Sequence, residues 1–437
     1  MRRLMMLSSI LCLGALMTAA LAAVPTPAPP QAGTIALVGG TVHPVDGPDI
    51  PNGTVIFSNG KITAIGASVT VPADAQKIDV TGKHVYPSLI DASTVIGLTE
   101  IGAIRATNDA AEVGDINPNV RAEVAVNPES EIIPVTRSNG VLLALTTPNG
   151  GVICGTSALL QLDGWTWEDL TLQSPIAMHV NWPRMSPVTA WWMQDSEEKQ
   201  LERRDQQLRV VRQAFDDART YMMAKAAGQA PEPDFRWDAM IPVLEGKLPV
   251  AIEADELQQI QAAAAFGESE KIKVIIVGGY DAPLCAELLK RDSIPVIIGG
   301  ILRTPQRVDD PFDTPFTVPD RLRQAGVSYC ISGGGDASNV RNLPYHAAKA
   351  ASYGLPVAEA LKSITIYPAR ILGVADRVGS LAVGKDATLF VADGDILDIP
   401  THVEQAFIQG RKLDLTDKQR VLWDKYKEKY KREGISN

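Results

Sequence analysis

Hydrophobic and polar residues alternate in short runs near both ends of the chain. Between residues 34 and 84 the runs TIALVGGTV, GTVIFSNGKITAIGA and IDVTGKHV are interrupted by turn residues, and Asn59-Gly60 is a hairpin signal. The same texture returns in GSLAVGKDATLFVADGD and VEQAFIQGRKL near the other end. We therefore expect residues 34–84 and 379–414 to form one small β-sandwich domain, with the rest of the chain inserted between them.

The inserted middle, residues 85–378, alternates apolar runs with longer helical stretches, which is the pattern of parallel βα units. The candidate strands are HVYPSLI, GVLLALTT, IAMHVNW, LPVAIEA, KVIIVGG, IPVIIGG and VSYCISGG. The candidate helices are Asp195–Ala227, Asp255–Phe266, Ala282–Arg291 and Pro344–Ser363. Seven strands approach the eight of a TIM barrel, so the prediction is an α/β fold with a distorted (β/α) barrel whose remaining strand the pattern does not locate.

Two further segments stand out by their polarity. The stretch Glu100–Arg137 is rich in Asn, Asp and Glu and has little periodicity, so we expect a long loop of the kind on which barrel enzymes build their sites. Residues 415–437 contain a highly charged stretch, Thr416–Glu433, that predicts a helix packed on the surface. Its apolar stripe is Val421, Leu422, Trp423 and Tyr426.

The N-terminus has the form of an export signal. A positive start, Met1-Arg2-Arg3, precedes an apolar run that closes in small residues at Ala23, which suits cleavage after residues 1–23. An uncleaved anchor is the alternative, although the run is barely long enough to span a bilayer. Leu11 before Cys12 argues against a lipoprotein signal. Residues 24–33 are Pro-rich and predict a flexible leader, and the mature protein is expected in the periplasm or outside the cell.

Composition narrows the function classes. The net charge of −10 and the pI near 5.1 argue against a nucleic-acid-binding surface, which needs a basic patch. After cleavage three cysteines remain, Cys154, Cys285 and Cys330, and an odd number without close spacing does not make a disulfide framework. Because each lies in or beside an apolar run, we interpret them as buried thiols rather than as a metal or redox site.

Several passages resemble the amidohydrolase superfamily, and in particular its secreted imidazolonepropionase-like members. VYPSLIDASTVIGL resembles the first barrel strand, which in that family is close to PGLIDxHxH, and GVLLALTTPNGGVICG resembles the second-strand segment. RNLPYHAAKAASYGLPVAEALKSITIYPARILGVADRVGSLAVGKDATLFVADGD resembles the last barrel helices and the return to the sheet domain. The resemblance implies a TIM (β/α)8 barrel with a composite β-sandwich, and hydrolysis of non-peptide C–N bonds by metal-activated water.

The resemblance also implies a set of metal ligands, and this sequence departs from it. The family carries His-x-His on the first strand, His on two later strands and Asp on the last. Here those positions hold Ser93, Val95, Glu253, Val277 or Gly278, and Ser332 or Gly333. The five histidines are His43, His84, His179, His346 and His402, and only His179 falls on a predicted barrel strand. We therefore predict that the metal site is lost and expect no cofactor, with a divalent metal only if the family chemistry survives.

Three carboxylates remain as catalytic candidates, namely Glu253, Asp255 and Asp336, with Asp91 below them. If they meet at the barrel mouth, an all-oxygen site would suit calcium or magnesium. The alternative interpretation is a solvated strand end followed by a helix start, with Asp255 serving as a cap, and we favour it. Asp91 is then a structural carboxylate.

Three other features of the sequence each allow two interpretations. Gly333-Gly334-Gly335 follows a strand as phosphate-binding loops do, but it lacks their fingerprint and predicts backbone crossing the barrel mouth. His179 predicts a buried barrel histidine more than a lone ligand. A group of tryptophans could line a substrate rim or pack beneath a loop; they are Trp165, Trp167, Trp182, Trp191 and Trp192.

Three functional hypotheses follow. The first is the hydrolase activity that the family implies, which would need Glu253, Asp255 and Asp336. The second is a pseudoenzyme that binds a small-molecule ligand in the old barrel pocket. The third is a structural subunit, because members of this family pair: the chain would form a homo-oligomer, or a heteromer with an intact amidohydrolase. None of the three involves nucleic acid, nor a membrane once the signal is cleaved.

Overall fold

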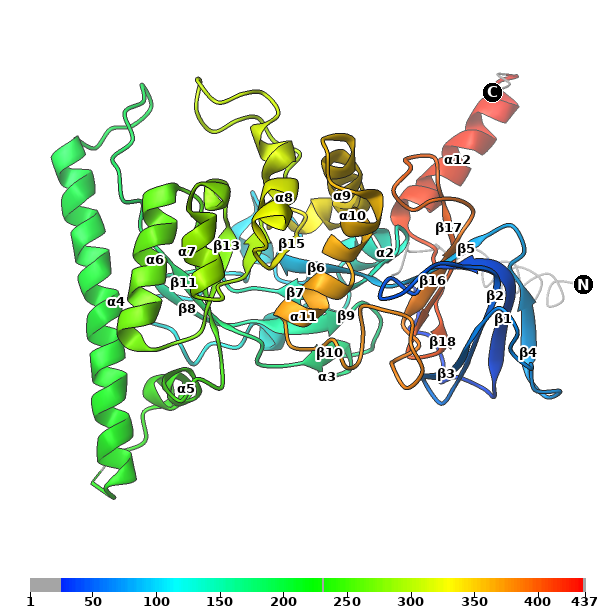
Figure 1. Cartoon of the computed structure of the whole chain (residues 1–437), viewed down its shortest axis with the longest axis horizontal. Helices are drawn as coiled ribbons and strands as arrows, with labels where there is room; N and C mark the ends of the chain where they lie inside the picture. The colour runs from blue at the N-terminus through cyan, green and yellow to red at the C-terminus, as the bar shows by residue number, and fades with distance from the viewer. Residues whose placement is uncertain (1–24, 230–231, 435–437) are drawn as a thin grey trace, which may run out of the picture.

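The computed structural model describes residues 25–229 and 232–434 (Figure 1). The signal peptide predicted for residues 1–23 lies outside these ranges, so export stays a prediction. The Pro-rich leader was expected to be flexible, but its described part lies against the protein. The Ala28 amide donates to Asp163 Oδ2 at 3.0 Å, and the Gln31 side chain bridges the Phe57 carbonyl and the Gly60 amide at 3.0 and 2.8 Å. These hydrogen bonds fix the leader, which composition alone does not reveal.

Both ends of the chain build one eight-stranded sheet, as predicted. Its order is β18-β17-β16-β5-β1-β2-β3, with β4 paired to β1. The strands are β1 (Ile35–Val42), β2 (Ile50–Ser58), β3 (Lys61–Gly66), β4 (Gln76–Asp79), β5 (His84–Pro87), β16 (Leu389–Ala392), β17 (Val403–Ile408) and β18 (Arg411–Lys412). The seam is the antiparallel pairing of β5 with β16, in which Pro87 lies opposite Leu389 and His84 opposite Ala392.

The predicted hairpin at Asn59-Gly60 joins β2 to β3. Both residues have positive φ, 50° and 77°, which is the conformation that favours Asn and Gly in two-residue hairpin turns. Inward-facing apolar side chains from both ends of the chain then form a single core under the sheet, including Leu37, Phe57, Leu389 and Phe407. Local turn chemistry and hydrophobic patterning therefore agree with the observed sheet.

The middle of the chain forms the barrel (Figure 1). Parallel pairing joins β6 to β7 and runs in order from β11 through β15. The strands are β6 (Leu89–Thr94), β7 (Val141–Thr146), β8 (Ile153–Thr156), β9 (Ala158–Gln161), β11 (Met178–Asn181), β12 (Val250–Ala254), β13 (Val274–Gly278), β14 (Val296–Ile298) and β15 (Tyr329–Ile331). A short β10 (Thr171–Gln173) extends the sheet beside β9.

The strand that the sequence pattern did not locate is the pair β8 and β9. Only Ser157 separates them, and they pair antiparallel with β11 and β7 respectively, so together they fill the gap between the two parallel sets. The pattern of parallel βα units cannot find this strand because no helical crossover precedes or follows it. An antiparallel strand in this place is the distortion of the barrel.

Asp91 links the last barrel strand to the first. Its Oδ1 accepts from the Ser93 amide and its Oδ2 from the Gly333 amide, both at 3.1 Å, and Thr94 forms a parallel bridge with Gly335. Asp91 is fully buried, and this burial raises the pKa of its carboxyl to about 7 despite the two amide donors, which lower it. The structural role predicted for Asp91 is therefore joining β6 to the segment after β15.

Helices cover the outside of the barrel, with α4 the longest and lying along one side (Figure 1). They are α2 (Ile132–Arg137), α3 (Trp167–Leu170), α4 (Glu197–Ala226), α5 (Phe235–Leu244), α6 (Leu257–Glu270), α7 (Ala286–Arg291), α8 (Thr314–Ala325), α9 (Leu343–Ser352), α10 (Val357–Ser363) and α11 (Ile366–Ile371). The 3₁₀ turns are η1 (Arg105–Thr107), η2 (Ala122–Ala125), η3 (Ala282–Cys285) and η4 (Ala337–Asn342). Within the described residues, no helix has the length and apolarity needed to cross a membrane.

Three helix predictions need correction. The single helix expected over Pro344–Ser363 is two helices, because Gly354 takes a φ of 109° and Pro356 begins the next helix. The helix expected from Ala282 begins instead as the 3₁₀ turn η3. The helix α12 (Lys418–Arg432) was expected to pack on the surface, yet none of its residues is buried, and it projects from the sheet end of the molecule (Figure 1).

A buried ion network ties the sheet to the barrel. Asp163, just after β9, accepts from Arg137 at 2.8 Å and from Arg411 of β18 at 2.7 Å. Arg411 also donates to the Asp163 carbonyl at 3.0 Å. The side chains of Asp163 and Arg137 are 2% and 3% exposed, so neither charge has water to compensate it. Desolvation lowers the pKa of Arg137, and the charge and hydrogen bond of Asp163 oppose this effect, so the pair stabilises a guanidinium that is buried in its charged form.

Asp163→Asn is expected to lower stability by about 3–5 kcal/mol, because it leaves a buried guanidinium without its counter-charge. Thermal and urea unfolding of the full chain would measure this. The matched control is Asp216→Asn, whose carboxylate is 68% exposed and 3.7 Å from Arg219, and which is expected to change stability by less than about 0.5 kcal/mol. Equal effects of the two substitutions would contradict the role given to the network.

Asp91→Asn tests the buried linkage through its pH dependence. A carboxyl whose pKa rises from 3.8 to about 7 on folding stabilises the protein fully below pH 3.8 and loses that contribution as pH rises through 7. Relative to the Asn variant, the native chain should therefore lose about 2 kcal/mol between pH 5 and pH 7, at about 1.4 kcal/mol per pH unit. Urea titrations of both chains across this range measure the difference. A difference that stays constant with pH would contradict the raised pKa.

Candidate functional site

A cavity of about 530 Å³ lies at the carboxyl ends of the barrel strands. It is where barrel enzymes place their chemistry. The sequence candidates Glu253, Asp255 and Asp336 line it together, and so do Ser93 and Gly278, two of the positions at which the family resemblance implies metal ligands. Other lining residues are Val277, Leu302, Arg303, Ser332, Asn339, Asn342 and His346, with glycines 299, 300, 333, 334 and 335. Residues far apart in the sequence therefore meet at one mouth.

Glu253 is the one of the three candidate carboxylates that is left free. It lies near the end of β12, its side chain is open to the cavity, and no described residue forms a hydrogen bond or ion pair with it. Desolvation by the surrounding barrel wall, and then the nearby charge of Asp255, raise the pKa of its carboxyl. A carboxylate with no partner and a raised pKa is stabilised by a proton, by a hydrogen-bond donor or by a cation.

Asp255, in contrast, uses both of its carboxylate oxygens in hydrogen bonds within the protein. Its Oδ1 accepts from the Tyr280 amide at 2.9 Å, while its Oδ2 faces the Gln306 side-chain amide and Arg303, the latter at 3.3 Å. It does not cap α6, as the favoured interpretation had it, because the N-cap residue is Glu256. Asp255 thus anchors the loop after β14 instead of beginning a helix.

That loop is held by a second set of contacts. Arg307 forms a bidentate pair with Asp281, at 2.6 and 2.8 Å, and a further contact of 3.0 Å with Asp310. Tyr280 lies beneath the guanidinium groups of Arg303 and Arg307, at 5.4 and 5.5 Å from its ring centre. A side cavity of about 480 Å³ shares Glu253, Asp255 and Arg303 with the mouth cavity, so the loop forms one wall of both.

Asp336 caps the turn after the three glycines. Its carboxylate accepts from the Ser338 amide and hydroxyl and from the Asn339 side chain, all at 2.9 Å. The preceding Gly333-Gly334-Gly335 lines the cavity, and a side chain at Gly333 would collide with Asp91, whose Oδ2 lies 2.6 Å from the Cβ position. Gly333 is required because the backbone passes close to a buried carboxylate, whereas Gly334 and Gly335 take positive φ, 97° and 84°. This explains the three glycines without a phosphate.

His346 is a site residue that the sequence analysis missed. It lies on α9, is 95% buried, and lines the cavity. Its Nδ1 accepts from the Ile301 amide at 3.1 Å, so the neutral ring carries its proton on Nε2, which has no hydrogen-bond partner among the described residues. Burial lowers the pKa of the imidazole to about 4, which keeps it neutral near physiological pH. Helical placement concealed it, because only the fold turns α9 toward the mouth.

The other histidines lie elsewhere. His43 and His84 belong to the sheet, where their ring nitrogens are 2.9 Å apart and Asp49 contacts His43 at 2.9 Å. His402 is exposed beside Asp393. His179 lies on β11 as predicted; its Nε2 is buried without a partner, and burial alone lowers the pKa of the imidazole to about 4.

The residues at the mouth do not fit the divalent metal that the fold family implies. Val95 packs with the apolar cluster beneath the loop, and neither it nor Gly278 has a side-chain donor atom. Ser93 offers only a neutral hydroxyl. Across residues 25–229 and 232–434, no group of three or more His, Cys, Asp or Glu side chains is arranged to hold an ion. A catalytic site of the usual kind needs three protein ligands and one open position.

Of the two alternatives for the tryptophans, a substrate rim is not found at this mouth. None of the five tryptophans lines either cavity there. Trp182 is buried against Phe266 outside the barrel, with ring centres 5.1 Å apart, whereas Trp191 is 96% exposed. Trp182 follows β11 on the face that packs against the helices, which is why proximity in sequence did not bring the group together.

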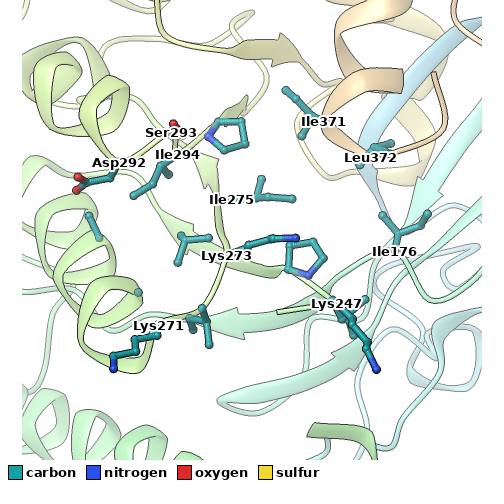
Figure 2. A pocket seen from close by; sticks show the side chains of 18 of the residues that line it. Ile176, Lys247, Lys271, Lys273, Ile275, Asp292, Ser293, Ile294, Ile371 and Leu372 are labelled. Atoms are coloured by element: carbon teal, nitrogen blue, oxygen red, sulfur yellow. The ribbon is translucent and has the colours of Figure 1, made fainter. Parts of the chain in front are cut away.

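The barrel has a second cavity at its opposite end, of about 770 Å³ (Figure 2). Its floor is apolar and includes Ile176, Ile275 and Leu372, while Lys247 and Lys273 extend at its edge. It lies at the amino ends of β12, β13 and β14, where conserved chemistry is not expected in a barrel of this type. None of the sequence candidates lines it.

Comparison with known proteins supplies the family. Residues 318–415 match the model of the Amidohydrolase family. The amidohydrolase tasK of Hapsidospora irregularis is 24% identical over 388 residues, which are 82% of this chain but 39% of that protein, so the chain spans about two fifths of its curated relative.

Two solved structures share the fold. The amidohydrolase from Thermotoga maritima MSB8 superimposes with a TM-score of 0.78 at 26% identity, over 87% of this chain and 99% of that one. An adenosine deaminase from Xanthomonas campestris with bound zinc has a TM-score of 0.50 at 16% identity, over 92% and 100%. The barrel with its composite sheet, the matched segment and the likeness to these amidohydrolases agree, and together they support the amidohydrolase superfamily for this chain.

Proposed function

We propose that this protein has lost the metal-dependent hydrolysis of its superfamily and binds a small molecule at the barrel mouth as a pseudoenzyme. The observation that carries the proposal is the set of side chains at the family's ligand positions, namely Ser93, Val95, Glu253 and Gly278. Activation of water by a divalent ion needs several strong donors that leave one position open. One carboxylate and one hydroxyl are too few to supply them.

The cavity itself supports retained binding. It keeps a volume of about 530 Å³, which is in the range of small-molecule pockets. Glu253 faces it with a free carboxylate, and His346 faces it with an Nε2 proton that no described residue accepts. Glu253 is exposed at the end of β12 and both residues line the cavity, so a bound molecule can reach both groups. The mouth therefore offers one acceptor and one donor to a bound molecule.

The charge balance of the mouth indicates the ligand class. Three carboxylates line the cavity against a single guanidinium, Arg303, which Asp255 already pairs. The free negative charge is that of Glu253. We infer a small molecule with a protonated nitrogen that pairs with Glu253 and an oxygen that accepts from His346. An amino amide, with its ammonium group and its carbonyl oxygen, has this combination.

The metal content of the purified protein tests the first half of the proposal. After incubation with zinc and dialysis, elemental analysis should find far less than one ion per chain, because the mouth lacks the donors. Glu253→Gln should leave that value unchanged. One ion per chain that disappears in Glu253→Gln, together with zinc-dependent amide hydrolysis, would overturn the loss of the metal site.

Ligand-dependent thermal stabilisation tests the second half. Lysinamide at millimolar concentration should raise the melting temperature, whereas N-acetylglycinamide, which lacks the charge, should not. Glu253→Gln should abolish the shift. Glu268→Gln is the matched control, because Glu268 lines the cavity at the opposite end of the barrel. Equal shifts in both variants would exclude Glu253 as the ligand's partner.

The same assay has a predicted pH dependence. An ammonium ligand needs the ionised form of Glu253, and burial raises the pKa of this carboxyl. Stabilisation should therefore be full at pH 8 and fall on acidification at a higher pH than an ordinary glutamate would require. A shift that persists unchanged to pH 4 would contradict pairing with Glu253.

A further inference from the structure

The helix α12 carries an apolar stripe that nothing in the described chain covers. Leu422, Trp423, Tyr426 and Tyr430 are 41%, 59%, 47% and 43% exposed. Their spacing of one, four and eight residues from Leu422 places them on one side of a helix. Only the first two turns of α12 approach the body of the protein, where one edge of Trp423 lines a cavity beside α2 and α9.

The rest of α12 is strongly basic. Between Lys418 and Arg432 it has seven Lys or Arg residues and two acidic ones, in a chain whose net charge is −10. Its ion pairs are local, joining Arg420 to Asp417, Arg432 to Glu428 and Lys429 to Glu433. Four lysines pair with no carboxylate of the described residues; these are Lys418, Lys425, Lys427 and Lys431.

A second segment has the opposite character. Residues 100–131 have seven Asp or Glu residues and two Arg residues. Four apolar side chains in this segment are about half or more exposed; they are Ile101, Ile104, Val113 and Val124. Asp109, Glu112 and Asp115 are exposed and form no ion pair with a described residue. Within one chain no ion pair or hydrogen bond between described residues joins this segment to α12.

We propose that α12 of one copy docks on residues 100–131 of a second copy of this chain. Each surface supplies what the other lacks: basic flanks around an aromatic stripe meet acidic residues around exposed aliphatic ones. Because every copy carries both surfaces, a two-fold arrangement makes the contact twice. Complementary charge sets the partner and the orientation, and burial of the apolar side chains supplies the affinity.

The charge of the whole chain favours a second copy over a lipid surface. An anionic membrane would attract α12 but would repel the acidic body from which the helix projects. In a second copy, the acidic residues 100–131 are themselves the surface that α12 binds. The contact is independent of the barrel mouth, so it stands or fails separately from ligand binding there.

Sedimentation of the mature full-length protein tests the proposal. We expect a dimer whose dissociation constant rises at least tenfold in K425E/K427E/K431E and in D109K/E112K/D115K. A mixture of these two variants should associate again, because the acidic helix of one then faces the basic segment of the other. Tyr426→Ser with Tyr430→Ser should weaken the native dimer without unfolding the chain, since neither tyrosine is buried.

The control is D216K/D217K on α4, which changes a similar amount of charge away from both surfaces and should leave the dimer intact. A native chain that is monomeric at 50–100 µM would overturn the proposal. So would a dimer that neither charge-reversal variant weakens, or variants that do not associate when mixed. Binding of the monomer to vesicles of anionic phospholipid, lost in K425E/K427E/K431E, would assign α12 to a membrane surface instead.

Discussion

The antiparallel pairing of β5 with β16 constrains everything between them. Because His84 lies opposite Ala392 and Pro87 opposite Leu389, the chain must leave the sheet and return to it at one place. The barrel is the segment of chain inserted between β5 and β16. Asp163 secures the junction from the barrel side, since its buried carboxylate holds the buried Arg137 and the partly exposed Arg411 at once. Sheet and barrel are therefore held together by one ladder and one buried ion network.

The barrel mouth keeps its shape through contacts that involve no metal. Asp91 joins β6 to the backbone after β15, and Asp255 holds the loop after β14 through Tyr280 and Gln306. Arg307 adds a bidentate pair with Asp281. These contacts join segments that are far apart in the sequence, up to 242 residues for Asp91 and Gly333. A superfamily scaffold can in this way keep an open pocket after its ligand positions have changed, because the strands and loops, rather than an ion, position the walls.

Charge is distributed unevenly over this acidic protein. The mouth contains the free carboxylate of Glu253 inside a desolvating wall, whereas the basic side chains gather on α12 at the far end of the chain. The first arrangement raises the affinity of the mouth for a cation or a proton. The second keeps the helix soluble without a packed face. Glu253 and four lysines of α12 form no ion pair with described residues. Such charges are available to attract a ligand or a partner of opposite charge.

The sequence alone determined the architecture and the departure of this chain from the ligand pattern of the family. Hydrophobic alternation, the Asn59-Gly60 turn and the family motifs were enough to predict the composite sheet and the barrel, because these signals are local and repeat along the chain. They also showed that Ser93, Val95, Glu253 and Gly278 stand where ligands are expected.

Only the tertiary structure decided the rest. It placed the antiparallel β8 and β9 in the barrel, turned His346 of α9 into the mouth, and separated Glu253, which is free, from Asp255, which is bound. The tryptophans lie in separate places in the structure, and no described residue buries the apolar side chains of α12. Each of these depends on which side chains meet across long stretches of chain. These tertiary contacts determine the burial, the hydrogen bonds and the pKa of each side chain. The periodicity of a single sequence does not reveal which residues form them.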